Sequence, residues 1–428
     1  MLEKPPKATG KEKREAFKLA SIKEIIEINE QYPYWDKVKH LSENKDYNNK
    51  ILWFALKNQR LLNYKFVYFG KYTFRYTVTN EILELLHDLD MNIGGYLTSE
   101  NILSQDKNRY IVSSIMEEAI ASSQMEGAST TRKIAKEMLR KNDKPKDKDQ
   151  QMIFNNYQTI NYIKDNAQTD FSIELLKEIH RSMTEKTLDE HSDAGKIREN
   201  NNILVMDGTT GDIAHNPPAH TELLQLLQDL ENFFNHHEKP FIHPIIKGII
   251  IHFILAYIHP FVDGNGRTAR SLFYWYLLKK GYWMVEYLSI SRIIYKTKRQ
   301  YEKAFLYTEY DDNDLTYFIL YNLRAMKTAF NELKLYLQRK TEENNSILLL
   351  ANFKDINVRQ AQIIKILIEN PTSVFTIKEI ETRFVVSNQT ARSDLLNLVK
   401  LGYLSEIQIN KRKTAFSKSL QFDEKTKD

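Results

Sequence analysis

A stretch of twelve residues, from His259 to Arg270, combines side chains that could carry out phosphoryl or nucleotidyl transfer. His259 has an ordinary pKa of about 6.5, so near neutral pH it can take a proton from an attacking hydroxyl group. Asp263 is a hard oxygen ligand of the kind that Mg²⁺ uses together with substrate phosphates. Arg267 and Arg270 are three residues apart, so on a helix they share a face and can both donate to a polyphosphate. This combination predicts a site that handles phosphate anions.

The flanking sequence can place this stretch at the end of one helix and the start of another. Residues 244–258 are almost continuously apolar, which is typical of a buried helix, and His259 lies where that helix should end. The Gly-Asn-Gly of residues 264–266 supplies the positive-φ positions of a tight turn, and a second helix is expected from 267 to about 280. The turn then presents unpaired backbone N–H groups at a helix N-terminus, where the dipole favours an anion.

The same stretch resembles the signature of the Fic family, His-Pro-Phe-x-Asp/Glu-Gly-Asn-Gly-Arg-x-x-Arg, with every defined position filled. Fic proteins are mostly adenylyltransferases, which move AMP from ATP to a Ser, Thr or Tyr hydroxyl of a target protein and release pyrophosphate. The resemblance implies ATP as co-substrate and Mg²⁺ as cofactor. It further implies His259 as the catalytic base, Asp263 as the Mg²⁺ ligand, and Gly264, Asn265, Gly266, Arg267 and Arg270 as phosphate contacts. Glycine at position 266 separates the chain from the Doc-type kinase variant of the fold, which resembles a signature with lysine there.

Another candidate group ends the helix expected over residues 110–127. Ser122 and Glu126 are four residues apart and share a face, and Gly127 is a typical residue just past a helix end. A carboxylate at a helix C-terminus is electrostatically unfavourable, because the helix dipole is already negative there. The residue pattern alone leaves Glu126 as a solvated surface carboxylate.

By resemblance, residues 122–127 fit the inhibitory motif of Fic proteins, Ser/Thr-x-x-x-Glu-Gly/Asn. In the family, the glutamate of this motif pairs with the second signature arginine, here Arg270, and keeps the ATP γ-phosphate from binding. The resemblance therefore implies an enzyme that is held inactive by Glu126, with Ser122 on the same helix.

A β-hairpin is expected where a short apolar run meets a turn rich in Gly and Asp. On the pattern alone it is a surface hairpin of no consequence. By resemblance it is the flap that docks the target segment beside the active site, by adding a target strand to its edge. The residues of its first strand are Ile203, Leu204, Val205 and Met206.

Tyr301 lies where the Fic family usually has a Tyr-Tyr pair near the adenine. The second position of the pair is Glu302 here, so the match is partial. By resemblance Tyr301 is an adenine contact, and on the pattern alone it is a core or surface tyrosine.

The chain divides into four parts by pattern. Residues 1–90 form a helical region with a charged, disordered start over about 1–15, and 91–340 form the Fic domain, in which 133–150 read as an exposed charged connector. Residues 341–356 are a linker, and 357–428 contain three helices followed by a hairpin, which resembles a winged-helix domain. The start of its third helix, with Asn388, Gln389, Thr390 and Arg392, has side chains that could read a DNA major groove, and docking of a protein is equally open.

Composition describes an ordinary soluble chain of 428 residues, 42% hydrophobic and 27% charged. The net charge of +5 implies no general affinity for nucleic acids or membranes, and the absence of cysteine excludes disulfides and thiolate chemistry. No signal peptide and no membrane span are visible, so a cytoplasmic location is expected. The expected fold class is mainly α, with a Fic-type helical core, a β-hairpin flap and a C-terminal winged-helix (α+β) domain.

Two other functions compete with AMP transfer. The same site could remove AMP from a modified protein by hydrolysis, with Glu126 helping to position water. Alternatively, the chain could be a DNA-binding regulator in which the Fic domain senses a ligand. The target protein, the modified hydroxyl and the oligomeric state, including a possible homodimer, are not encoded in any recognisable pattern.

Overall fold

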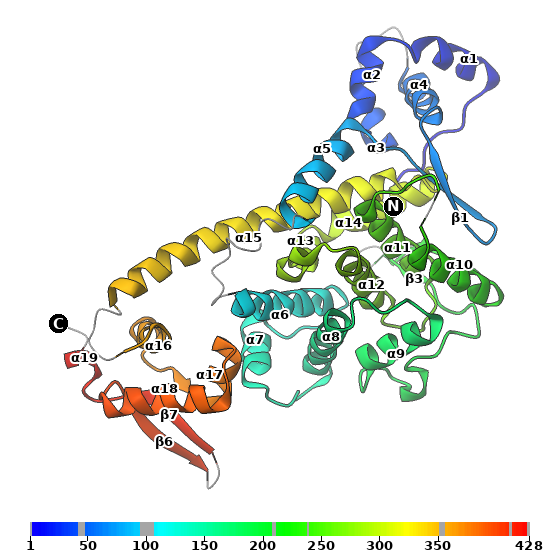
Figure 1. Cartoon of the computed structure of the whole chain (residues 1–428). Coiled ribbons are helices and arrows are strands. Elements are labelled where there is room, and N and C mark those ends of the chain that lie inside the picture. Colours follow the sequence, from blue (N-terminus) through cyan, green and yellow to red (C-terminus); the bar gives the residue numbers. More distant parts are fainter. Residues whose placement is uncertain are drawn as a thin grey trace.

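The computed structural model of the protein describes residues 2–41, 48–94, 107–207, 211–237, 239–350, 356–410 and 413–425. Within these residues the chain is mainly helical, as the sequence predicts, with small antiparallel sheets (Figure 1). None of the described helices is both long and apolar enough to cross a lipid bilayer.

The N-terminal region is helical and contains one β-hairpin. Its first helix starts at Gly10, which corrects the expectation of a disordered start, because Thr9 and Glu12 form a capping box. The Thr9 N–H donates to the Glu12 carboxylate at 2.7 Å, and Ala16 is buried on the inner face. The elements of this region are α1 (Gly10–Leu19), α2 (Lys23–Glu30), α3 (Trp35–Val38), α4 (Asn49–Leu61), β1 (Lys65–Phe69), β2 (Tyr72–Tyr76) and α5 (Asn80–Leu89).

The central body carries the signature and the elements around it. Part of the expected connector at 133–150 is instead the helix α7, because Ala135, Met138 and Leu139 recur at helical spacing and pack against α6 and α8. The elements are α6 (Lys107–Met125), α7 (Arg132–Lys141), α8 (Lys148–Asp165), α9 (Ile173–Thr184), β3 (Val205–Met206), β4 (Ile213–His215), α10 (Leu223–Asn235), α11 (Pro244–Ile258), α12 (Asn265–Lys279), α13 (Ile290–Lys296), α14 (Lys298–Tyr310) and α15 (Thr316–Leu350).

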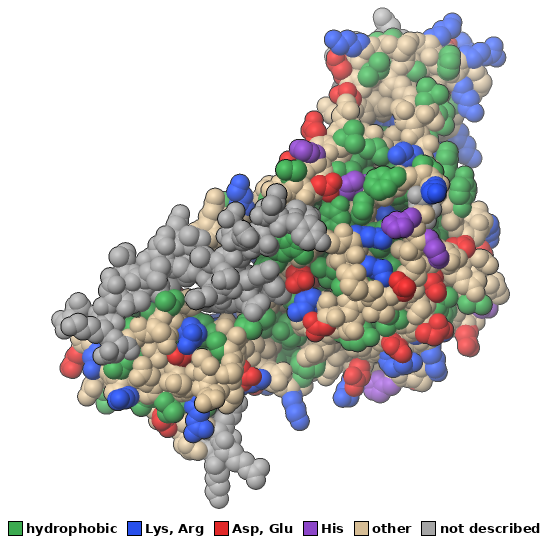
Figure 2. All heavy atoms as spheres, viewed as in Figure 1, with side chains coloured by type: hydrophobic (Ala, Val, Ile, Leu, Met, Phe, Trp, Pro, Cys, Tyr) green, Lys and Arg blue, Asp and Glu red, His purple; other side chains and the backbone are tan. Residues whose placement is uncertain are grey.

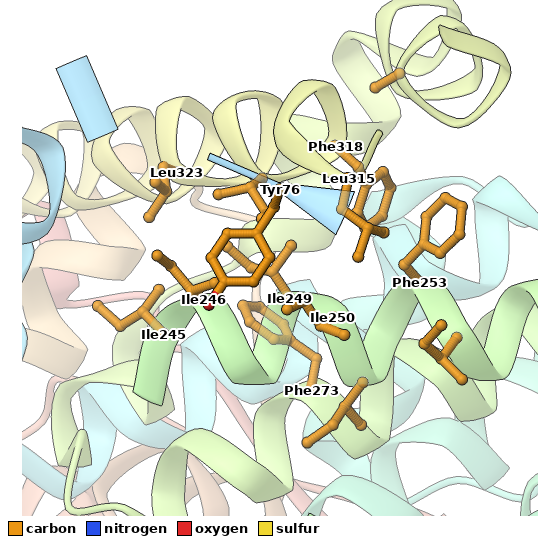
Figure 3. Packing of buried hydrophobic residues seen from close by; sticks show 14 of the residues in the cluster. Tyr76, Ile245, Ile246, Ile249, Ile250, Phe253, Phe273, Leu315, Phe318 and Leu323 are labelled. Carbon is orange, nitrogen blue, oxygen red and sulfur yellow. The ribbon is translucent and has the colours of Figure 1, made fainter. Parts of the chain in front are cut away.

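Helix α11 lies at the centre of the body and is buried along almost its whole length. Its apolar residues are not confined to one stripe, which is the pattern of a helix covered on all sides. In Figure 3, Ile246, Ile249 and Phe253 lie between α15, which contributes Phe318, and α12, which contributes Phe273. Burial of these side chains fixes the axis of α11 and therefore the position of the turn that follows it.

The C-terminal part forms a separate, smaller core. Its elements are α16 (Val358–Glu369), β5 (Val374–Phe375), α17 (Ile377–Phe384), α18 (Asn388–Lys400), β6 (Leu404–Asn410), β7 (Lys413–Lys418) and α19 (Phe422–Lys425), and the sheet order is β5-β7-β6. The three helices and the hairpin lie where the sequence predicts them, and β5 adds a third strand. The linker expected at 341–356 is helical as far as Leu350, because α15 continues through it, and 351–355 lie outside the described residues.

A buried network of charges and hydroxyls ties the N-terminal region to the body. Asp314 is fully buried and accepts hydrogen bonds from the hydroxyls of Tyr32 at 2.7 Å and Tyr64 at 2.8 Å. Lys57 of α4 lies 3.7 Å from the same carboxylate and 2.8 Å from that of Asp311. These bonds compensate for the cost of removing several ionised groups from water.

We expect Asp314→Asn to destabilise the protein by about 3 kcal/mol or more, because a buried cation then loses one of its anionic partners. The measurement is urea unfolding followed by tryptophan fluorescence. Asp312→Asn is the matched control, since its carboxylate is exposed and pairs only at the surface with Arg75, at 3.1 Å. Equal urea midpoints for the two variants would show that the network does not stabilise the fold.

Candidate active site

His259 is the residue that ends α11. It adopts the left-handed conformation, with φ of 50°, and its N–H donates to the Leu255 carbonyl at 3.0 Å. This backbone turn points the chain away from the helix axis and leaves the imidazole half-buried. The Nδ1 atom lies 3.2 Å from the Ala256 carbonyl oxygen, an acceptor, so Nδ1 carries the hydrogen and Nε2 keeps a free lone pair. Burial lowers the pKa of His259 to about 4.

Arg198 holds the backbone of this turn and was assigned no role from the sequence. Its guanidinium donates from Nε to the His259 carbonyl at 2.9 Å, and its own N–H donates to the Pro260 carbonyl at 2.9 Å. The side chain is buried, so these bonds form away from competing water. Sixty-one residues separate Arg198 from His259, and no local pattern indicates the contact.

Asn265 closes the loop with its side chain. The Phe261 N–H donates to the Asn265 Oδ1 at 2.9 Å, and the Asn265 Nδ2 donates back to the Phe261 carbonyl at 2.8 Å. The resemblance made Asn265 a phosphate contact, whereas in this structure both polar atoms of its amide are engaged with the loop. Its side chain therefore shapes the turn, and its backbone begins α12.

His180 of α9 supports the same loop and was also missed. Its ring stacks on Phe261, with centroids 3.7 Å apart and an angle of 7° between the planes. The Gly195 N–H donates to Nδ1 at 2.9 Å, so Nε2 carries the hydrogen and donates to the Asp263 carbonyl at 2.7 Å. Burial lowers the pKa of His180 to about 4, which keeps the ring neutral in this tautomer.

Asp263 itself is exposed on the turn, with its backbone carbonyl anchored by His180. Among the residues that the structure describes, no group of three or more His, Cys, Asp or Glu side chains is gathered to hold a metal. A single carboxylate with free coordination sites fits an ion that takes its remaining ligands from phosphates and water.

Gly264 and Gly266 leave room at the start of α12. Gly264 has φ of +79°, and a Cβ atom there would lie 2.7 Å from the Thr184 methyl group. A Cβ atom on Gly266 would overlap the Glu126 carboxylate. Position 264 therefore favours glycine for its backbone conformation, whereas a side chain at 266 would displace the Glu126 carboxylate.

The two signature arginines are buried and differ in their partners. Arg270 donates from Nε to the Ser122 hydroxyl at 2.9 Å, and from Nη2 to the Glu126 Oε1 at 2.8 Å. Arg267 donates from Nη1 to the Met183 carbonyl at 3.1 Å, and its Nε and Nη2 have no partner among the described residues. A buried guanidinium with unused donors suits an anionic ligand.

Helix α6 brings Ser122 and Glu126 to Arg270. Burial raises the pKa of Glu126, but the charge of Arg270 and its hydrogen bond outweigh this effect, so the pKa is lowered and the carboxylate stays ionised. Glu118, on the same helix, accepts hydrogen bonds from the Tyr274 hydroxyl at 2.8 Å and the Ser291 N–H at 2.9 Å. Glu126, at the end of the helix, thus pairs with the buried Arg270, which the residue pattern alone did not indicate.

A cavity of about 260 Å³ opens between the end of α6, the start of α12, α14 and the β3–β4 hairpin. It brings together the catalytic, phosphate and inhibitory candidates His259, Gly266, Arg270 and Glu126, with Val205 and Met206 of the hairpin and with Tyr301. The Tyr301 hydroxyl bonds His252 Nε2 at 2.9 Å, so Tyr301 belongs partly to the core. Ile203 and Leu204 precede β3 and do not line the cavity, and residues 208–210 of the turn lie outside the described residues.

His215 fixes the hairpin against the body. Its Nε2 lies 2.8 Å from the Tyr257 carbonyl oxygen, and its Nδ1 lies 2.9 Å from the Glu309 carboxylate. The hairpin therefore forms one wall of the cavity, and its second strand is held against the body by His215.

Comparison of the sequence with known proteins finds relatives of this chain. The sequence profile of the Fic/DOC family matches residues 170–277. The protein adenylyltransferase Fic of Drosophila melanogaster is 33% identical over 113 residues, which cover 26% of this chain and 21% of the relative. Its counterpart from Drosophila mojavensis is 41% identical over 68 residues, or 16% of this chain and 14% of the relative. The chain thus spans about a fifth or less of the length of these curated relatives.

The fold also resembles that of a solved Fic family protein from Desulfovibrio desulfuricans. The TM-score is 0.51 at 19% identity, and the match covers 81% of this chain and 98% of the other. At this identity the likeness concerns the fold alone, while the profile match covers the whole signature. Residues 170–277 therefore form a domain of the Fic/DOC family.

Proposed function

We propose that the protein is an adenylyltransferase that moves AMP from ATP to a Ser, Thr or Tyr hydroxyl of a target protein, and that Glu126 holds it inactive. One observation carries the proposal: His259, Gly266 and Arg270 line a single cavity, and Glu126 lines it too, with its carboxylate bonded to Arg270. The filled signature and the names of the relatives support the same activity.

In the proposed step, His259 acts as the base. Its Nε2 lone pair takes the proton of the target hydroxyl, whose oxygen attacks the α-phosphorus of ATP. The new P–O bond forms as the bond to pyrophosphate breaks, so AMP is transferred and pyrophosphate leaves. The left-handed backbone of His259 and its bonds to Arg198 orient the ring without a substrate present.

The anionic groups of ATP would bind to the start of α12. Arg267 has unused donors there, Gly266 leaves space for a phosphate, and Arg270 becomes available once Glu126 withdraws. Asp263 would hold a divalent cation such as Mg²⁺, which supplies positive charge to the phosphates when bound. Tyr301 and the hairpin would contact the adenine and the target segment.

Inhibition would follow because Glu126 takes the place that an ATP phosphate needs. The Glu126 carboxylate accepts from Arg270 and covers Gly266, so an ATP phosphate cannot use either group at the same time. Two anions in one cradle would also repel each other.

We expect Glu126→Gly to raise the transfer of α-labelled AMP to the protein itself, because Arg270 loses its carboxylate partner and the space over Gly266 becomes free. Adding His259→Ala should reduce the label at least about 100-fold, since general-base catalysis is worth at least that much. Mass spectrometry of the intact protein checks both results. Glu137→Ala, on the outer face of α7, is the control and should behave as the wild type. Unchanged labelling in Glu126→Gly would contradict the inhibitory role.

The pH dependence of kcat/KM should reflect the low pKa of His259. The base acts in its neutral form, which predominates above its pKa of about 4, so kcat/KM of the Glu126→Gly variant should stay level as the pH falls from 8 to 5.5. An exposed histidine would lose activity through about pH 6.5. A decline centred near that value, in protein shown to be folded by circular dichroism, would mean that burial does not set the protonation state of His259.

Hydrolytic removal of AMP remains the competing activity of the same cavity, because the Glu126 carboxylate could orient a water molecule toward a bound phosphate. Incubation of AMP-modified protein with wild type and with Glu126→Gln separates the two. Release of AMP by the wild type alone would favour removal over transfer.

A second candidate function rests on α18. Its inner face buries Ala391, Leu395 and Leu398, while the polar side chains of Gln389 and Arg392 are exposed on the outer face. A helix with this exposed polar face could enter a DNA major groove, and we infer that it is the surface of the C-terminal part that binds DNA.

Arg392→Ala should therefore weaken the binding of duplex DNA and make the affinity less sensitive to salt. Fluorescence anisotropy at several salt concentrations measures both quantities, with Arg324→Ala, which pairs with Glu81 at 2.6 Å, as the control. Equal loss in both variants, or no DNA binding by the wild type, would leave α18 as a protein-docking surface.

A further inference from the structure

A second cavity, of about 380 Å³, lies between α6, α7, α13 and α15. It shares no lining residue with the cavity that contains His259. Its charged side chains are Glu117 of α6, Arg132 and Lys136 of α7, Arg292 of α13, and Glu332 and Arg339 of α15.

The charges of this cavity are unbalanced. Four basic side chains and two carboxylates line it, whereas acidic and basic side chains are interspersed over the face shown in Figure 2. The hydrogen bond from Arg132 and the charge of Lys136 outweigh the effect of burial and lower the pKa of Glu117, which therefore stays ionised. Glu117 thus serves two cations, and the other carboxylate, Glu332, lies 3.8 Å from Arg292, so the cavity keeps a positive excess.

Two hydroxyl groups also belong to the wall of this cavity. The Tyr287 hydroxyl and the Ser289 Oγ are covered from solvent and have no hydrogen-bond partner among the described residues. Burial raises the pKa of Tyr287, so its hydroxyl stays neutral and can donate. Buried polar groups normally find a partner, and a bound acceptor close to the wall could supply one.

We propose that this cavity binds a small, multiply charged phosphate compound. Guanidinium groups on α7 and α13 can grip phosphate oxygens in pairs, and the volume suits a nucleotide-sized molecule better than a single ion. The two wall hydroxyls complete the donor set.

The position of the cavity connects it to α6. Arg132 donates from Nε to both Glu117 oxygens, at 2.7 and 2.6 Å, and Glu117 lies nine residues before Glu126 on the same chain segment. A phosphate in the cavity competes with Glu117 for Arg132 and Lys136. Binding therefore loosens the polar contacts of Glu117 with α7, while the contacts of Glu118 with Tyr274 and Ser291 remain. The effect on α6 matters for activity only if Glu126 has its proposed inhibitory role, whereas the binding of phosphate to the cavity does not depend on that role.

Isothermal titration calorimetry with inorganic tripolyphosphate tests the site in the full-length protein at low ionic strength. The Arg292→Gln variant should bind at least tenfold more weakly than wild type, and Arg132→Lys, which keeps the charge but loses the planar fork, should lie between them. Arg324→Gln, an exposed arginine paired with Glu81 outside the cavity, is the matched control. Glu126→Gly opens the other anion site, so a second binding event should appear there and persist in Glu126→Gly/Arg292→Gln.

Equal affinity of wild type, Arg292→Gln and Arg132→Lys would overturn the proposal, as would an equal loss in Arg324→Gln. Hydrogen–deuterium exchange tests the link to α6 without any activity assay. Tripolyphosphate should speed exchange at residues 117–127 in wild type and leave it unchanged in Arg292→Gln. If binding occurs at the cavity without that change, the site stands and its coupling to Glu126 is wrong.

Discussion

The burial of α11 is the constraint on which the site depends. An apolar helix covered on all sides cannot rotate or slide without exposing its side chains, so the residue that ends it has a fixed position. His259 is that residue, and the turn after it is then held by Arg198, His180 and Asn265. The reactive groups are thus placed by packing first and by hydrogen bonds to the backbone second.

The Glu126–Arg270 ion pair forms on α12, the helix that follows this turn. A guanidinium that is buried needs a counter-charge, because an isolated charge in a low-dielectric site is costly. Glu126 provides that charge in the structure described, and a phosphate could provide it in its place. The need for a counter-charge therefore stabilises the contact between Glu126 and Arg270, and it also makes the site able to bind an anionic ligand. Which of the two binds Arg270 depends on which negative group lies nearer and is better aligned.

The contiguous part of the site could be predicted from the sequence, and the distant part could not. His259, Gly264 and the two arginines follow from local patterns of helix end, turn and helix start, and they lie where these patterns place them. His180 and Arg198 reach the loop only through tertiary packing, and an isolated His or Arg in a sequence gives no sign of its partner. The helix α7 was missed because its many charges obscured the spacing of its apolar residues.

Gly266 has a consequence for how such chains can change over time. The Glu126 carboxylate occupies the space where any side chain at position 266 would begin. A side chain at 266 would therefore displace the Glu126 carboxylate from this position, although 140 positions separate the two residues in the sequence. Among homologues the two positions should covary, because a side chain at 266 would move the glutamate away from the start of α12.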